Sequence, residues 1–160
     1  MASITLPKRI EEKLKEKAQE AGVFPEELGI ELLFQSLNEE LDPQDLIEHY
    51  QNLSGKYLTE AKEFLNSGDS VQASEKFWGS AALAVKTVAA KKGMKLETHG
   101  SLWSFVDKLS KESGDEDILR FFGEANALHR NFYESEMTLK AVGVLSTDIE
   151  KLITKLERFS

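Results

Sequence analysis

Apolar residues recur every three or four positions along most of the chain, and this spacing constrains the fold more than any other feature. Such spacing puts apolar side chains on one face of an α-helix, where they must be buried against another element. The last segment is the clearest case and keeps one register through Leu139, Val142, Leu145, Ile149, Leu152, Ile153 and Leu156. The sequence therefore predicts an all-α protein.

Glycines, prolines and capping residues divide residues 42–160 into helical segments. Asp42 and Pro43 open the first, which runs to about residue 65, and the next two are expected over about 69–92 and 98–112. The Gly114–Asp115 turn leads into a segment that reaches at least residue 132, and the last segment follows it. Because the connections are short, we expect an antiparallel up-and-down bundle of four or five helices over residues 42–160.

The segment 69–92 is apolar around most of its circumference, which is typical of a helix at the centre of a bundle. Trp78 in this segment and Trp103 in the next are expected in the core. Glu75 and Lys86 lie eleven residues apart and therefore share one face of the helix. They either border a groove or mark the solvent margin of the helix, and the solvent margin is the simpler interpretation.

Residues 1–41 have a different pattern from the rest of the chain. Ser3–Leu6 alternates polar and apolar residues like a half-exposed strand, and two helical segments follow, the second apolar through Leu41. This order resembles the ribbon-helix-helix unit of small dimeric repressors, in which paired strands read DNA bases. The outward residues would be Ser3 and Thr5, and the region holds five Lys or Arg against nine Glu. We therefore expect a dimerisation arm and a homodimer rather than DNA binding.

Composition excludes several classes of protein. The net charge is −8, with 28 acidic and 20 basic residues, which disfavours binding to duplex nucleic acid. The absence of cysteine excludes disulfides and thiolate metal sites and fits a cytoplasmic protein. No apolar run exceeds five residues, so no membrane span is expected. The sequence has no metal-binding spacing and no phosphate-binding glycine loop, so we predict neither metal nor cofactor. The abundance of Lys, Glu and Arg is typical of thermophiles.

A polar strip on the segment that follows Asp115 is the first candidate site. Asn126, His129, Arg130 and Tyr133 are spaced so that they lie along one side of a helix. Histidine can exchange protons near neutral pH, and arginine can hold a phosphate. The strip could therefore bind a phosphate or a nucleotide. The alternative is that His129 and Tyr133 border the core and that Arg130 lies in solvent.

A second candidate site opens the segment 98–112. Thr98 is expected to cap the helix, and Gly100 leaves backbone amides accessible to an anion. The helix N-terminus should make His99 harder to protonate. Ordinary helix capping explains the same residues, and both interpretations remain open.

Three stretches resemble the archaeal PaREP family, which is related to the HEPN superfamily: DSVQASEKFWGSAALAVK at 69–86, HGSLW at 99–103 and LHRNFYE at 128–134. The resemblance covers about residues 42–158 and implies a dimeric helical bundle that binds a nucleotide or RNA. Many HEPN proteins are ribonucleases with an arginine followed, after four to six residues, by a histidine. The corresponding positions after Arg130 hold Ser135, Glu136 and Met137, and His129 lies too far from Arg120. The catalytic signature is absent, which favours a protein that is not an enzyme.

Three functions remain open at this stage. The first is a non-catalytic homodimer that binds a nucleotide or RNA near His129 and Arg130. The second is a ribonuclease, as in toxin–antitoxin systems, that uses His129 and His99. The third is a DNA-binding regulator that uses residues 1–41.

Overall fold

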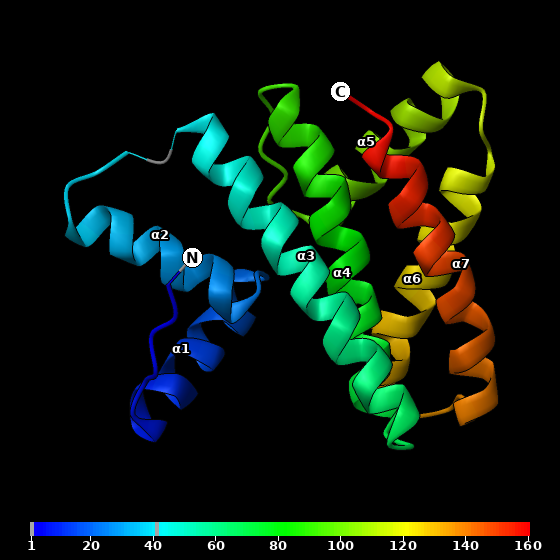
Figure 1. The fold of residues 1–160 in the computed structure, drawn as a ribbon, viewed down its shortest axis with the longest axis horizontal. Coiled ribbons are helices and arrows are strands. Elements are labelled where there is room, and N and C mark those ends of the chain that lie inside the picture. The colour runs from blue at the N-terminus through cyan, green and yellow to red at the C-terminus, as the bar shows by residue number, and fades with distance from the viewer. Residues whose placement is uncertain (1, 41) are drawn as a thin grey trace. The chain divides into compact units, whose positions relative to one another are not determined.

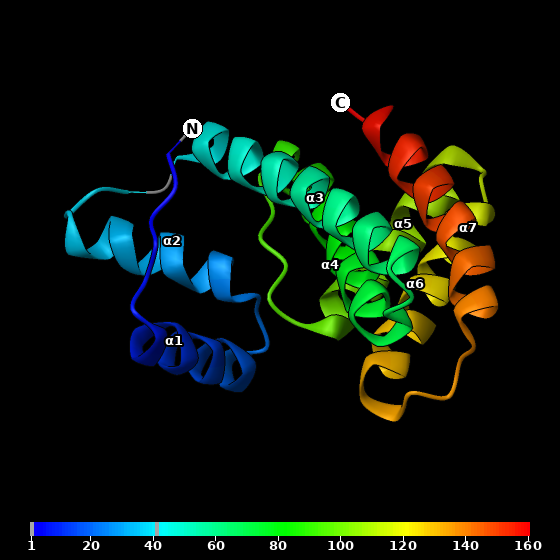
Figure 2. The same cartoon turned by 60° about the horizontal axis from the view of Figure 1, so that its bottom comes forward.

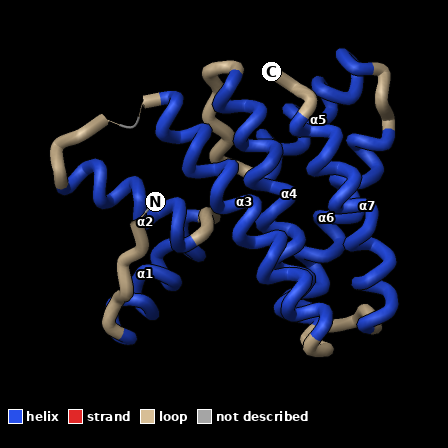
Figure 3. Tube along the Cα trace, in the orientation of Figure 1, coloured by secondary structure: helices blue, strands red, loops and turns tan. Residues whose placement is uncertain are grey.

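The structure is a computed structural model that describes residues 2–40 and 42–160. Within these residues the chain forms seven α-helices and no strand. Figure 3 shows the helices in blue, joined by loops. The predicted all-α class is confirmed. The chain divides into two compact units, residues 1–42 and residues 43–160.

The N-terminal unit contains two helices that pack against each other, α1 (Lys8–Ala21) and α2 (Pro25–Ser36). Gly22 ends α1 with a φ of 70°, a conformation that favours glycine, and its N–H group points at the carbonyls of Ala18 and Gln19. Pro25 occupies the first turn of α2, where a missing amide donor has no cost. These local signals mark the end of α1 and the start of α2.

The strand predicted for Ser3–Leu6 is not formed, and this part of the prediction is wrong. A strand needs a neighbour for its backbone hydrogen bonds, and the described residues contain no other strand. Ile4 consequently stays exposed. The second helix also ends earlier than its apolar pattern, because Asn38 adopts a positive φ of 57°. Leu41, which belongs to that pattern, lies outside the described residues.

The C-terminal unit contains five helices: α3 (Pro43–Asn66), α4 (Ser70–Lys91), α5 (His99–Ser113), α6 (Asp117–Glu134) and α7 (Leu139–Glu157). Helix α4 packs against each of the other four, and its residues from Phe77 to Ala90 are all buried. Figures 1 and 2 show α3 running alongside α4 from two directions. The central position predicted for the segment 69–92 is confirmed.

Two serines join α3 to α4 inside the unit. The Ser54 hydroxyl donates to the carbonyl of Ser80 at 2.8 Å, and the Ser80 hydroxyl donates to the carbonyl of Ser54 at 2.8 Å. Because each buried hydroxyl finds an acceptor on the facing backbone, the two helices can approach closely without leaving a polar group unsatisfied.

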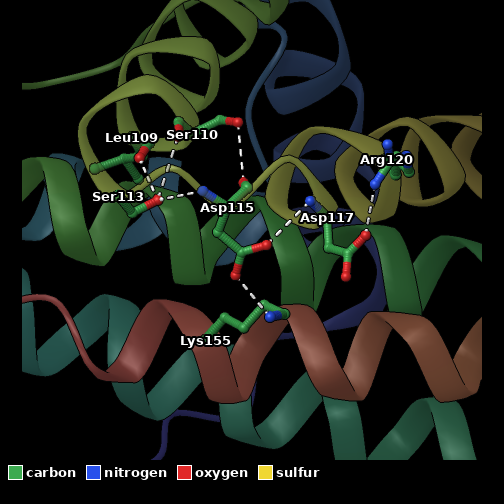
Figure 4. Close-up of polar contacts among 7 residues, drawn as sticks. All are labelled: Leu109, Ser110, Ser113, Asp115, Asp117, Arg120 and Lys155. Atoms are coloured by element: carbon green, nitrogen blue, oxygen red, sulfur yellow. Dashed lines mark hydrogen bonds and ion pairs between the residues drawn. The ribbon is translucent and has the colours of Figure 1, made fainter.

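The turn between α5 and α6 is fixed to α7 by Asp115 (Figure 4). Lys155 Nζ lies 2.6 Å from Asp115 Oδ2, the Asp117 amide donates to Asp115 Oδ1 at 3.1 Å, and Ser110 Oγ donates to the Asp115 carbonyl at 2.9 Å. Gly114 has a φ of 69° and allows the sharp reversal. The turn predicted at Gly114 and Asp115 is confirmed.

None of the helices in the described residues has both the length and the apolar character needed to cross a membrane.

Candidate functional site

The candidate site is a cluster of side chains from α4, α5 and α6, which we call the His129 cluster: Glu75, Trp78, Lys86, His99, His129 and Tyr133. Its central contact joins Glu75 Oε2 to His129 Nδ1 at 2.8 Å across the packed helices α4 and α6. Both side chains are partly exposed, at 23% for Glu75 and 19% for His129. A carboxylate on Nδ1 fixes the orientation of the imidazole and directs its Nε2 away from the carboxylate.

Three aromatic rings surround the His129 imidazole. Trp78 is buried and stacks on it, with ring centroids 4.9 Å apart and an interplanar angle of 27°. His99 and Tyr133 both meet it edge-on, with centroids at 5.3 Å and 5.4 Å. The Tyr133 side chain is 62% exposed, so the cluster presents aromatic surface to solvent.

The charges of the cluster act on its two outer rings. Partial burial, the imidazole of His129 and the ammonium of Lys86 lower the pKa of His99, and the nearby Glu75 opposes them. Partial burial and the negative charge of Glu75 raise the pKa of Tyr133. At neutral pH, His99 is therefore an uncharged imidazole and Tyr133 is an uncharged phenol.

The end of α5 that carries His99 is formed by local hydrogen bonds. Thr98 Oγ1 accepts from the Ser101 amide at 3.0 Å, and Ser101 Oγ accepts from the Thr98 amide at 3.1 Å. The predicted cap at Thr98 is confirmed. The pKa of His99 is lowered as expected, but the causes are burial, His129 and Lys86 rather than the helix N-terminus.

Asn131 holds α6 in register with α4 close to the cluster. This residue is 3% exposed, donates to Ser74 Oγ at 2.9 Å and accepts from the Met137 amide at 2.8 Å. One side chain thus satisfies a buried hydroxyl and a backbone amide beyond the end of α6. It fixes the segment that brings His129 to Glu75.

The predicted site residues do not all meet. His129, Tyr133 and His99 lie together, although His99 was assigned to a separate site in the sequence. Arg130 Nε donates to Glu134 Oε2 at 2.8 Å on the exposed side of α6. Asn126 is partly buried on the same helix.

Sequence reasoning missed how α4 contributes to the site. Glu75 was not recognised as the partner of His129, and Trp78 was assigned to the core alone. Of the two positions open for Lys86, a groove border and the solvent margin, the sequence favours the margin, but the residue is buried at 6% exposure. The available signal was the three-residue spacing of Glu75 and Trp78, which puts a carboxylate and a large ring side by side on a helix.

The described residues contain no group of three His, Asp or Glu side chains that could hold a metal ion. The groups of the cluster itself offer stacking on aromatic rings, hydrogen bonding by imidazoles, and charge from Glu75 and Lys86.

Comparisons with known proteins give one family and one structure. The model of the Archaeal PaREP1/PaREP8 family matches residues 49–153. A crystal structure of a protein from Sulfolobus solfataricus is similar at 27% identity and a TM-score of 0.59, over 66% of this chain and 93% of that one. No curated protein matches significantly. The matched residues include the whole His129 cluster.

Proposed function

This chain belongs to the Archaeal PaREP1/PaREP8 family, and we propose that it is a non-catalytic homodimer that binds a nucleotide or RNA at the His129 cluster. The observation that carries the proposal is the contact at 2.8 Å that holds His129 to Glu75 while the same ring stacks on Trp78. An imidazole fixed on both sides is preorganised for a ligand, since little freedom remains to be lost on binding.

The exposed rings favour a ligand with a nucleobase. Tyr133 and His99 each meet the His129 ring edge-on and offer aromatic surface beside it. Proteins bind unpaired bases by stacking them on such rings, and each stack contributes about 1–3 kcal/mol. The net charge of −8 disfavours a long phosphate backbone, so a nucleotide or a short single-stranded RNA fits better than a duplex. Nucleotides and RNA are also typical ligands of the HEPN proteins that the sequence motifs resemble.

Calorimetric titration tests this proposal with the four ribonucleoside monophosphates, a short single-stranded RNA and duplex DNA. We expect heat from at least one nucleotide or from the RNA, and none from the duplex. His129→Ala should weaken that binding at least about 10-fold, equivalent to about 1.4 kcal/mol. His49→Ala, which changes the histidine of α3 outside the cluster, is the matched control. Absence of heat from every ligand, or equal effects of the two variants, would refute the proposal.

The predicted Arg130 contact is tested in the same assay. Arg130 is exposed and paired with Glu134, so it can reach a ligand only by exchanging that partner. If Arg130 contacts the phosphate, Arg130→Ala should lower the affinity for nucleotides and leave the affinity for nucleosides unchanged. Equal affinities for both would remove Arg130 from the site.

Residues 2–40 support the homodimer. Ile4, Leu6, Ile10, Leu32, Leu33 and Leu37 are exposed apolar side chains in this short region. The similar Sulfolobus structure covers 66% of this chain over 93% of its own length, so about a third of this chain has no counterpart in that match. We expect light scattering to show a dimer for the full chain and a monomer for a chain that starts at Asp42. If both proteins contained the same number of chains per particle, residues 2–40 would not be what joins the subunits.

A second candidate function is cleavage of RNA, favoured by two imidazoles whose centroids lie 5.3 Å apart. His99, which resists protonation, could take the proton from a ribose 2′-hydroxyl as that oxygen attacks phosphorus. His129 could give a proton to the departing 5′-oxygen as its bond to phosphorus breaks. Incubation with labelled RNA tests this cleavage. Cleavage that persists after both histidines are replaced would rule out His99 and His129 as its catalysts.

A further inference from the structure

His99 differs from His129 in the hydrogen bonding of its ring nitrogens. Its side chain is exposed, and neither ring nitrogen forms a hydrogen bond within the described residues. The ring instead contacts Trp78 at 5.5 Å and His129 at 5.3 Å, both measured between centroids. His99 is thus a polar group held in place by aromatic contacts, with its hydrogen-bonding capacity available to a ligand.

The charged and titratable groups that face His99 come from two helices. Helix α4 supplies Glu75 and Lys86, and helix α6 supplies His129, with Tyr133 beyond it. Glu75 contacts His129 at 2.8 Å, and Lys86, a residue that is 6% exposed, carries a positive charge. A cation near His99 therefore acts through a medium less polarisable than water, where its field is stronger.

We propose that the phosphate of the bound nucleotide lies against His99 and that His99 takes up one proton as the phosphate binds. The inference rests on the proposed nucleotide binding and adds the ligand class, a phosphate monoester, and its orientation. Partial burial, His129 and Lys86 keep the free imidazole neutral, and a phosphate dianion reverses the balance of charge around it. The base then lies towards the exposed ring of Tyr133.

In this proposal, phosphate binding and protonation of His99 are thermodynamically linked. A ligand that binds the protonated form of His99 more tightly must raise the pKa of His99 and must take up protons from the buffer. Its affinity must also fall as the pH rises above the pKa of the free imidazole. A nucleoside without phosphate has no such requirement.

The experiment compares AMP with adenosine on the full-length protein. Proton NMR follows the three histidine ring signals through a pH titration, with His49→Gln, His99→Gln and His129→Gln used for assignment. We expect saturating AMP to raise the pKa of His99 and adenosine to leave it unchanged. Calorimetry in buffers of different ionisation enthalpy should give an uptake that approaches one proton per AMP.

Two variants sharpen the result. His99→Gln replaces an exposed side chain. It should lower the affinity for AMP at least about 10-fold, towards the affinity for adenosine, and abolish the proton uptake. Lys86→Met should raise the pKa of His99 in the free protein. His49→Gln should change neither affinity nor uptake.

The outcomes separate this inference from the proposed function. Equal affinities for AMP and adenosine, or AMP binding without proton uptake, would overturn the inference and leave nucleotide binding in place. Binding of single-stranded RNA without binding of AMP would do the same. If AMP, adenosine and RNA all failed to bind, both the inference and the proposed function would be overturned.

Discussion

Two of the carboxylates in the bundle, Asp115 and Glu75, each contact a basic group on a neighbouring helix, and their surroundings differ. Asp115 contacts Lys155 at 2.6 Å, and its remaining partners, such as the Asp117 amide and Ser110 Oγ, belong to its own turn (Figure 4). Glu75 contacts His129 at 2.8 Å, and that imidazole contacts rings rather than further hydrogen-bond partners.

The difference separates a structural network from a candidate binding site. Around Asp115, donors and acceptors are satisfied within the fold, so a ligand would have to break existing bonds. In the His129 cluster, the Nε2 of His129 and both nitrogens of His99 form no hydrogen bond among the described residues. A ligand can satisfy these groups without cost to the fold.

The largest effect should follow from removing the ring beneath the cluster. Trp78 is 3% exposed, and truncation of a buried Trp costs about 3–5 kcal/mol. We expect Trp78→Ala to lower the free energy of unfolding by that amount in urea denaturation. Trp103→Ala, at a half-buried position on α5, should cost less. A smaller loss for Trp78→Ala than for Trp103→Ala would contradict the central position of Trp78.

The next effect concerns binding rather than stability. His129→Ala should weaken nucleotide binding at least about 10-fold, because it removes the oriented imidazole. The free energy of unfolding should change by less than about 1 kcal/mol, because the Glu75–His129 contact is partly exposed. A large loss of stability without loss of binding would make the Glu75–His129 contact as structural as the one at Asp115.

A third polar pair gives a pH-dependent prediction. Burial and the neighbouring carboxyl of Asp148 on α7 raise the pKa of Glu124 on α6 to about 7, while Lys151 opposes them. Since the unfolded carboxyl ionises at a lower pH than the folded one, stability should fall from about pH 4.5 and level off above about pH 7. We expect a total change of about 1 kcal/mol in urea denaturation at several pH values.

Glu124→Gln provides the control for that prediction. An amide cannot ionise, so the variant should lack the decline between about pH 4.5 and pH 7. It should also be more stable than the natural chain at pH 8. Identical pH profiles for the two proteins would show that Glu124 does not share a proton with Asp148.

The smallest effect should come from the structural network. Lys155→Met removes the cation from Asp115, and both side chains are only partly buried. Such pairs contribute about 0.2–1 kcal/mol, so we expect a loss of about 0.5 kcal/mol in thermal unfolding. Nucleotide affinity should be unchanged. Weakened binding would show that the turn at Asp115 is coupled to the His129 cluster.

Local patterns predicted the helices because their causes are local. The apolar spacing, the cap at Thr98 and the turn at Gly114 each involve residues within a few positions of one another. The same reasoning failed for Ser3–Leu6, because an alternating pattern shows only that a segment suits a strand. Whether the strand forms depends on a second strand, and the described residues contain none.

The candidate site was predicted in part for the same reason. His129 and Tyr133 were grouped correctly because four residues separate them on one helix. His99 was found as an isolated helix start, and Lys86 was misplaced because its burial depends on what packs over α4. Helical periodicity gives the face of a residue but not the neighbour that covers that face.

The sequence by itself determined that this protein is helical, where most of its helices begin and end, and that it carries no cysteine and an excess of acidic residues. Only the tertiary structure decided that Glu75 meets His129 across 54 residues of sequence and that His99 joins them from a third helix. The physical reason is that helix formation depends on hydrogen bonds and caps within a few residues. The contacts of the cluster depend on the packing of α4, α5 and α6, which no local pattern specifies.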